Sequence, residues 1–270
     1  EESAEVYQIL ATLTGDVQQQ WAQLVTDPQL ISQLDQIMAR GQYALQTQSC
    51  LPKLTDDQHL KIINGRHPLL GQQAVPLNIE LASHQGLMIT GANSGGKTVV
   101  LKTIALFALM VQVGLEIPAD AGTEIPVFTQ VWLDIGDNQS LAAQLSTFAA
   151  EMTTLVTMTD AIQPNALVLL DEIGSGTDPE EGSALSIAII DYLRAQQATI
   201  VATTHFSAIK SYAVACPTFM TATMAFDRKT LEPTYQILLN QVGASEAIWL
   251  AERLGLSQTI LTAARERLGK

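Results

Sequence analysis

One stretch of the sequence has the residue types and spacing of a phosphate-binding loop. It fits the pattern G-x-x-x-x-G-K-[ST] and continues into Val99, with the residues Gly91, Ala92, Asn93, Ser94, Gly95, Gly96, Lys97 and Thr98. Glycines let the backbone adopt positive φ and approach a ligand closely, so successive N–H groups can form a nest for an anion. Lys97 would reach the β- and γ-phosphates of a nucleotide, and the Thr98 hydroxyl would bind Mg²⁺. The alternative is a glycine-rich turn with no ligand.

Two carboxylates follow a second apolar run. Asp171 and Glu172 come directly after Ala166–Leu170, a continuous apolar stretch typical of a buried strand. A phosphate loop needs a metal-holding carboxylate at the end of a neighbouring parallel strand, and Asp171 is suited to hold Mg²⁺ through water. Glu172 would point differently and could orient or deprotonate an attacking water as catalytic base. The alternative is a solvated strand terminus with no chemical role.

A histidine and a serine are further candidates. His205 follows the apolar run Thr199–Thr203, and we expect that strand beside the strand of the phosphate loop, where an imidazole could sense the γ-phosphate. A lone histidine after a strand is otherwise a structural or surface group. Ser146 opens a helix-like segment with Thr147 and Phe148. From the residues alone it is a helix N-cap, although a hydroxyl beside free N–H groups also suits an anion.

The elements that must position these residues follow from the hydrophobic pattern. Short apolar runs predict strands, and longer runs with a period of three to four predict helices. Their alternation predicts an α/β fold with a mixed sheet, mostly parallel in its centre and flanked by helices. The predicted strands are 61–63, 75–81, 87–90, 127–133, 166–170, 199–203, 220–226 and 234–239, the last two as a hairpin. The predicted helices are 97–113, 146–161, 180–196, 244–254 and 257–268, with a short one after His205 and a loop at 117–126.

The first fifty residues have a purely helical pattern. Residues 1–25 form an amphipathic helix, Asp27-Pro28 predicts a break and restart, and a second helix runs to Thr47. Two successive helices with glutamine-rich outer faces fit the end of a helical arm. A plain helical hairpin packed on the following domain fits equally well.

Composition narrows the class of protein. The 270 residues are 47% hydrophobic, which allows one large domain, or a domain with an appendage, to bury a sizeable core. The 14 Lys and Arg against 27 Asp and Glu give a charge of −13, which argues against a broad nucleic-acid-binding face in this segment. Cys50 and Cys216 form no CxxC pair, which indicates a reducing cytoplasm. No apolar run reaches the roughly 18 residues that span a bilayer, there is no signal peptide, and the chain starts without Met, so we expect a piece of a longer cytoplasmic protein.

Taken together, these segments resemble the ATPase domain of MutS proteins, which belong to the ABC-type ATPases. The resemblance rests on 91–98, on Ser146-Thr147-Phe148 with Glu151-Met152, on Asp171–Thr177 and on Thr203-Thr204-His205. The stretches 145–148, 176–185 and 231–235 are closer to the MutS-two branch than to mismatch-repair MutS, and Arg66–Leu70 also fits. The resemblance covers about residues 38–268.

The resemblance implies a division of the chain and a shared site. Residues 51–270 would be the ATPase domain, and 1–50 the C-terminal end of the helical lever and core arm. In this family the ATPase domains form head-to-tail homodimers, so Ser146 would act across the interface on the γ-phosphate, with Gly174–Asp178 at the same interface. Asp134 and Asp137 would lie in the segment that links the nucleotide to the rest of the protein.

The sequence also departs from the family pattern. Ala92 stands where the family usually has proline, which leaves the entry of the loop less rigid. Asn240–Ala247 keeps the glycine, the serine and the last alanine of a G-x-P-G-x-S-x-A run but not its first glycine and its proline. That change affects the adenine side of the pocket, where we expect Val75 and Pro76 to touch the base.

The sequence therefore predicts a Mg²⁺-dependent ATPase domain of MutS-two type that binds ATP and ADP. Whole family members are linked to suppression of recombination through branched or mismatched DNA, and some to rRNA binding and rescue of stalled ribosomes. The nuclease-type domain of such proteins is absent from this segment, so nuclease activity and tight DNA binding are not expected of it. A nucleotide-gated scaffold with incidental turnover is a rival. An ABC-type ATPase of transporter or chromosome-organising kind is disfavoured, because Leu145–Phe148 stands where those have a Leu-Ser-Gly-Gly run.

Overall fold

The computed structural model describes residues 2–91, 95–135, 144–227, 230, 232–243 and 247–267. Ala92, Asn93, Ser94 and Asp137 lie outside the described residues, and at Ser146 only the backbone is described. The chain divides into two compact units, Glu1–Ser49 and Cys50–Lys270.

The first unit consists of two helices, α1 (Glu2–Gln19) and α2 (Trp21–Thr47). The break between them falls at Gln20, so the predicted break at Asp27-Pro28 is wrong, and Pro28 lies inside α2. Proline's fixed φ is compatible with a helix, and α2 continues without the one backbone bond that Pro28 cannot donate.

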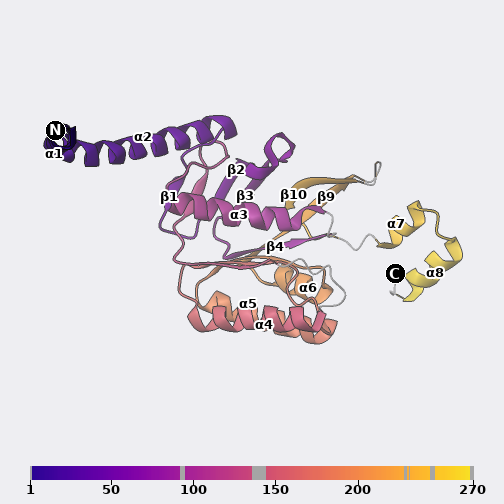
Figure 1. Cartoon of the computed structure of the whole chain (residues 1–270). Coiled ribbons are helices and arrows are strands. Elements are labelled where there is room, and N and C mark those ends of the chain that lie inside the picture. Colours follow the sequence, from indigo (N-terminus) through magenta and orange to yellow (C-terminus); the bar gives the residue numbers. More distant parts are fainter. Residues whose placement is uncertain are drawn as a thin grey trace. The chain divides into compact units, whose positions relative to one another are not determined.

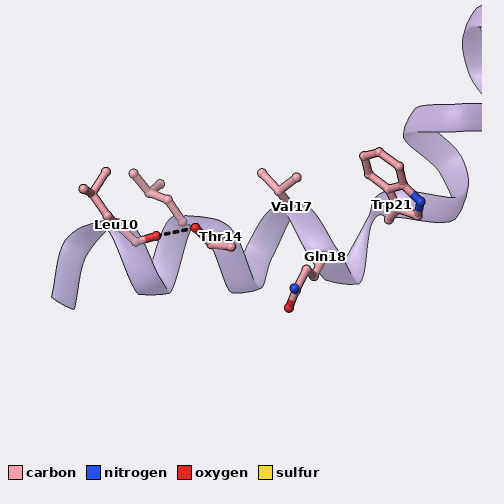
Figure 2. A pocket seen from close by; sticks show the side chains of 6 residues that line it. Leu10, Thr14, Val17, Gln18 and Trp21 are labelled. Carbon is pink, nitrogen blue, oxygen red and sulfur yellow. Dashed lines mark hydrogen bonds between the residues drawn. The ribbon is translucent and has the colours of Figure 1, made fainter. Parts of the chain in front are cut away.

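The apolar side chains of this unit are exposed. Neither helix buries a residue in the described structure. Figure 2 shows Leu10, Val17 and Trp21 on one side of the first helix and the start of the second, with Thr14 Oγ1 bonded to the carbonyl of Leu10 at 2.7 Å. Trp21 is 63% exposed, so this hollow is open to solvent. Its lining residues are mostly apolar and include no acidic or basic side chain, so the hollow is not a candidate catalytic site.

The second unit is built on a six-stranded sheet (Figure 1) with the strand order β10-β9-β4-β8-β7-β6. Strands β9, β4, β8, β7 and β6 run parallel, and β10 pairs antiparallel with β9. The bounds are β4 (Gly86–Thr90), β6 (Val131–Asp134), β7 (Leu167–Leu170), β8 (Thr199–Thr203), β9 (Phe219–Asp227) and β10 (Glu232–Leu239). The predicted mixed α/β fold and the C-terminal hairpin are therefore confirmed.

A smaller sheet with the order β1-β5-β2-β3 accompanies the first. Its strands are β1 (Lys53–Thr55), β5 (Glu124–Pro126), β2 (Lys61–Gly65) and β3 (Leu77–Glu80), with the 3₁₀ helix η1 (Pro68–Gln73) before β3. Helix α3 (Lys97–Gln112) contacts strands of both sheets, and its Phe107 is fully buried. The predicted loop at 117–126 is wrong at its end, because a strand of three residues is too short to show a period in the sequence.

Three helices cover the opposite face of the large sheet from α3 (Figure 1): α4 (Gln144–Ala161), α5 (Pro179–Ala195) and α6 (Ser207–Ala215). Strand β7 is buried along its whole length, as expected for a parallel strand with helices on both faces. Its core neighbours include Leu155 and Met158 of α4, Ile190 and Leu193 of α5, and Ile209 and Ala213 of α6. Each Leu, Ile or Met side chain among them contributes about 1.5–3 kcal/mol through burial, so the strand ends beneath the polar residues are held firmly.

The strand order decides which polar residues can meet. Strand β8 lies beside β4, as predicted for the strand that precedes His205. Strand β7, which carries Asp171 at its end, is separated from β4 by β8. The carboxyl ends of β4, β8 and β7 nevertheless lie at one edge of the sheet, because all three run parallel.

The C-terminal helices α7 (Ala247–Arg253) and α8 (Gln258–Arg267) contact each other. Arg265 bonds Glu252 at 2.6 Å between them, and Gly255 has φ 91° in the turn. Across the described ranges, no helix combines the length and the apolar character needed to cross a membrane.

Candidate functional site

Lys97 lies buried at the first turn of α3, where the phosphate loop enters the helix. Gly96 precedes it with φ 91° and provides no side-chain cap for the first turn of α3. The side chain of Lys97 is 1% exposed, and its Nζ donates to the Gly91 carbonyl at 2.8 Å and lies 3.8 Å from Glu172 Oε1. Burial lowers the pKa of Lys97, and the charges of Glu172 and Asp171 offset part of that effect. The lysine is thus held across the loop that it is expected to serve.

The loop itself rests closely on the C-terminal hairpin. A Cβ on Gly95 would lie 2.9 Å from Cβ of Met224 in β9, and one on Gly96 would lie 3.1 Å from Cδ1 of Tyr235 in β10. Gly96 also needs its positive φ. Glycine at both positions therefore serves close backbone approach, as the sequence pattern predicts.

Asp171 receives a hydrogen bond on each carboxylate oxygen. Thr98 Oγ1 donates to Oδ2 at 2.5 Å, and Thr203 Oγ1 donates to Oδ1 at 2.6 Å. In the described ranges no group of three or more His, Cys, Asp or Glu side chains could hold a metal ion by itself. Mg²⁺ commonly keeps several waters and takes one or two protein oxygens plus substrate phosphates. The pair of Thr98 and Asp171 fits such a site.

Glu172 has a backbone conformation that is unusual for its residue type. Its φ is 52°, and few non-glycine residues adopt positive φ without a compensating contact. The compensation here is Thr203, whose hydroxyl accepts from the Glu172 N–H at 2.7 Å while it donates to Asp171. One buried hydroxyl therefore holds both the carboxylate of Asp171 and the backbone of Glu172, whose side chain lies 3.8 Å from Lys97 Nζ.

Sequence reasoning did not identify Thr203 as a site residue. The available signal was a hydroxyl at the last position of a buried strand, two residues before His205. Because β8 lies between β4 and β7, this hydroxyl is placed between the two motifs.

The loop after Glu172 packs against the start of α5. A Cβ on Gly174, which has φ 82°, would lie 2.7 Å from the carbonyl oxygen of Gly182. Asp178 caps α5 by accepting from the N–H groups of Glu180 and Glu181. The predicted interface segment Gly174–Asp178 is therefore held by backbone contacts within the chain.

Two further carboxyl groups lie behind Asp171. Burial, then the charge of Asp171, raises the pKa of Asp134, whose carbonyl accepts from the Asp171 N–H at 2.9 Å. Burial and the charge of Asp134 raise the pKa of Glu151 in α4 to about 7, and a hydrogen bond from the Gly174 N–H opposes this. Glu151 Oε1 is buried and has no hydrogen-bond partner among the described residues. Three carboxyl groups, those of Asp171, Asp134 and Glu151, therefore interact on one side of the site.

An apolar cavity of about 370 Å³ lies beside the start of α3. Val75, Val99 and Tyr235 line it, together with Gly65, His67, Leu70, Gln73, Ala74, Leu77, Gly96, Val100 and Thr103. Burial lowers the pKa of His67, and its Nδ1 accepts from the Leu69 N–H at 3.3 Å. Tyr235 reaches this place because the pairing of β9 and β10 shifts register between Pro233 and Ile237.

The other two predicted site residues lie near the ends of two elements, His205 after strand β8 and Ser146 in the first turn of helix α4. His205 lies two residues after the end of β8, is exposed, and has its ring 4.3 Å from that of Phe206. Helix α4 begins at Gln144, so Ser146 lies in its first turn and not at its opening as predicted. Among the described residues, no hydrogen bond or ion pair joins His205 to the network of Lys97, Asp171 and Thr203, and the Ser146 side chain lies outside the described residues.

The fold and this site define a class: an α/β domain with a phosphate loop, of the P-loop ATPase type. Comparison with known proteins gives the family, because the family described as MutS domain V matches residues 87–270. The chain therefore belongs to the MutS family, as its motifs predicted.

Individual relatives are similar over nearly the whole chain. A protein of Symbiobacterium thermophilum named Endonuclease MutS2 is 44% identical over 268 residues, which is 99% of this chain and 34% of the relative. Proteins of the same name from Halalkalibacterium halodurans and Halothermothrix orenii are 43% and 42% identical, over 99% and 98% of this chain and 34% of each relative. The chain thus spans about a third of the length of these MutS-two relatives.

Proposed function

We propose that the chain binds ATP with Mg²⁺ on the phosphate loop and hydrolyses it, as a domain of ABC-ATPase type. One observation carries the proposal. Thr98, Asp171, Thr203 and Glu172 form a continuous hydrogen-bonded network that ends beside the buried ammonium of Lys97. A solvated strand end would not need a buried hydroxyl to hold the carboxylate of Asp171 and the backbone of Glu172.

The residues of the chain divide the work. Lys97 exchanges the Gly91 carbonyl for the β- and γ-phosphate oxygens, which are stronger acceptors for an ammonium group. Thr98 and Asp171 hold Mg²⁺, which when bound neutralises charge on the phosphates. Glu172 orients the attacking water and accepts its proton. Gly91–Thr98 supplies backbone N–H groups that stabilise the phosphate charge, and ADP remains as product on the same loop.

The nucleoside would occupy the apolar cavity beside α3. Val75 and Val99 offer it apolar walls, and the Tyr235 ring lies against Gly96 at the point where the base would leave the phosphate loop. Such a wall of aliphatic and aromatic side chains is typical of a pocket for a flat base. This supports the prediction for Val75 and adds Tyr235 to it.

We further propose that the site is completed by a second copy in a head-to-tail homodimer. Ser146 in the first turn of α4 and the held segment Gly174–Asp178 would face the nucleotide of the partner subunit, and His205 would contact the γ-phosphate. The exposed apolar faces of α1 and α2 support their assignment as the end of a longer helical arm.

The whole protein would act on branched DNA, in keeping with the name Endonuclease MutS2 of the relatives. With a net charge of −13, residues 1–270 by themselves should bind DNA weakly.

Glu172→Gln tests the proposal. The variant should bind ATP like the wild type, while its turnover falls by roughly a hundredfold or more, because the general base is lost. Glu80→Gln, the same change at an exposed position in β3, should leave both unchanged. Equal turnover of wild type and Glu172→Gln would refute the base assignment and favour the nucleotide-gated scaffold.

A further inference from the structure

Lys210 is a half-buried cation in the first turn of α6. Its Nζ lies 3.5 Å from the carbonyl oxygen of Gly243. No carboxylate in the described ranges lies within ion-pair distance of it. Burial alone lowers its pKa, as expected for an ammonium group taken partly out of water without a compensating negative charge.

Other cations of the described structure do have such partners. They form the pairs Lys53–Glu124, Lys61–Glu80, Arg66–Asp120, Arg194–Asp191 and Arg265–Glu252. In a chain with 27 acidic and 14 basic residues, a half-buried lysine left without a carboxylate is unusual. Its position should therefore serve an anion that comes from outside the chain.

Gly243 places Lys210 at the phosphate loop. The Gly243 N–H donates to Thr90 Oγ1 at 2.8 Å, and a Cβ on Gly243 would lie 3.2 Å from both N and Cα of Gly91. Lys97 bonds the carbonyl of the same Gly91. Lys97 of α3 therefore bonds the first residue of the loop directly, and Lys210 of α6 reaches it through Gly243.

The two cations also affect each other. The charge of Lys210 contributes to the lowered pKa of Lys97, although burial is the larger cause. Two positive charges beside one loop repel each other, and a bound anion would offset that repulsion. A nucleoside di- or triphosphate carries the negative charge that would neutralise the ammonium groups of Lys97 and Lys210.

We propose that Lys210 is a second cation of the phosphate site, which strengthens the binding of nucleoside di- and triphosphates through its charge. The inference rests on the proposed nucleotide site at Gly91–Thr98. A purely structural role is the alternative, in which Lys210 only anchors the segment 240–243 by its bond to Gly243.

The test compares nucleotides that differ in phosphate number. Equilibrium affinities for ATP and ADP with Mg²⁺, and for AMP, are measured on Lys210→Met, Lys210→Arg, wild type and the control Lys53→Met, which removes a cation that is 69% exposed. Lys210→Met should weaken ATP binding by roughly tenfold and ADP binding less, because the energy follows the ligand charge. AMP binding and the Lys53→Met variant should change little, and Lys210→Arg should keep most of the affinity.

The outcomes separate the two proposals. If wild type and Lys53→Met bind ATP and Lys210→Met binds it equally well, the role of Lys210 is refuted and the nucleotide site stands. Equal losses in Lys210→Met and Lys210→Arg, or equal losses for ATP and AMP, also overturn it in favour of an anchor. A wild-type protein that binds no ATP overturns both proposals.

A second measurement needs no variant. Amine-specific methylation of wild-type protein should slow at Lys210 when ATP and Mg²⁺ are added but not when adenosine is added, with Lys61 as an internal reference. An unchanged rate at Lys210 under saturating ATP contradicts the proposal.

Discussion

Replacing Thr203 with valine removes the hydroxyl that joins the carboxylate of Asp171 to the backbone N–H of Glu172. The Thr203 side chain is fully buried, donates to Asp171 at 2.6 Å and accepts from the Glu172 N–H at 2.7 Å. Valine has nearly the same shape, so the change isolates the hydrogen bonds from packing.

The magnitude follows from the two bonds. A hydrogen bond to a charged group contributes about 1.5–3 kcal/mol, and a buried N–H left without a partner costs about 1–3 kcal/mol. Thr203→Val should therefore lower the free energy of unfolding by roughly 3–5 kcal/mol. Turnover should fall by roughly a hundredfold, because Asp171 loses one of its two hydrogen bonds and the backbone that carries Glu172 loses its anchor.

The same strand supplies the control. Thr199 is equally buried in β8, but its hydroxyl has no hydrogen-bond partner among the described residues. Thr199→Val should therefore be neutral or slightly stabilising, within about 1 kcal/mol, since no bond is lost. Thr203→Ser keeps the hydroxyl and should retain most of the turnover.

Chemical denaturation and steady-state ATP turnover measure these effects. If Thr203→Val and Thr199→Val agree within about 1 kcal/mol, the hydroxyl does not fix the site. The reasoning also fails if Thr203→Ser loses as much turnover as Thr203→Val.

Three further predictions follow from single contacts. Gly174→Ala should lower the free energy of unfolding by more than about 2 kcal/mol, because its Cβ would lie 2.7 Å from the carbonyl oxygen of Gly182. As a control, a Cβ on Gly41 in α2 would contact no other atom, so Gly41→Ala should stabilise the protein by about 1 kcal/mol. Thermal melts measure both effects. The native pKa of Glu151 is raised from 4.5 to about 7, so wild-type stability falls as pH rises through that window. Glu151→Gln should remove this pH dependence, so its advantage over wild type in the free energy of unfolding should grow by about 2 kcal/mol between about pH 5 and about pH 8. Chemical denaturation at both pH values measures this difference, and an advantage that stays constant would contradict the prediction. Tyr235→Ala should weaken ATP and adenosine binding alike, by roughly tenfold, and a loss confined to ATP would place the ring elsewhere.

Much of the fold was predictable because the apolar pattern reports burial directly. Strand β8 has the predicted bounds, and α3 begins at the predicted Lys97 because the glycine-rich loop can only precede a helix there. The three-residue strands β1 and β5 gave no period, and the break at Gln20 has no proline or glycine to mark it. Patterns thus predict elements that bury a face and miss those that depend on a single neighbour.

The same difference separates the predicted from the unpredicted site residues. Lys97, Thr98, Asp171 and Glu172 belong to motifs in which spacing along the chain fixes the chemistry. Thr203, Lys210 and Tyr235 enter the site through strand order, a helix after β8 and a register shift in the hairpin. No local spacing encodes those relations, so only the tertiary structure shows them.

The arrangement of charge explains why these late additions matter. Lys97 and Lys210 lie near Gly91 on one side of the site, and two carboxyl groups, those of Asp134 and Glu151, lie behind Asp171 on the other. Within each group, the like charges shift a pKa in the direction that disfavours the charged form. Without a ligand, the site therefore holds like charges together at a cost in stability. In the proposed complex, a nucleotide phosphate with Mg²⁺ would bring negative charge to the lysines and positive charge to the carboxylates, so it would relieve both sides at once. Ligand binding should accordingly stabilise the native state through these charges as well as through its own contacts.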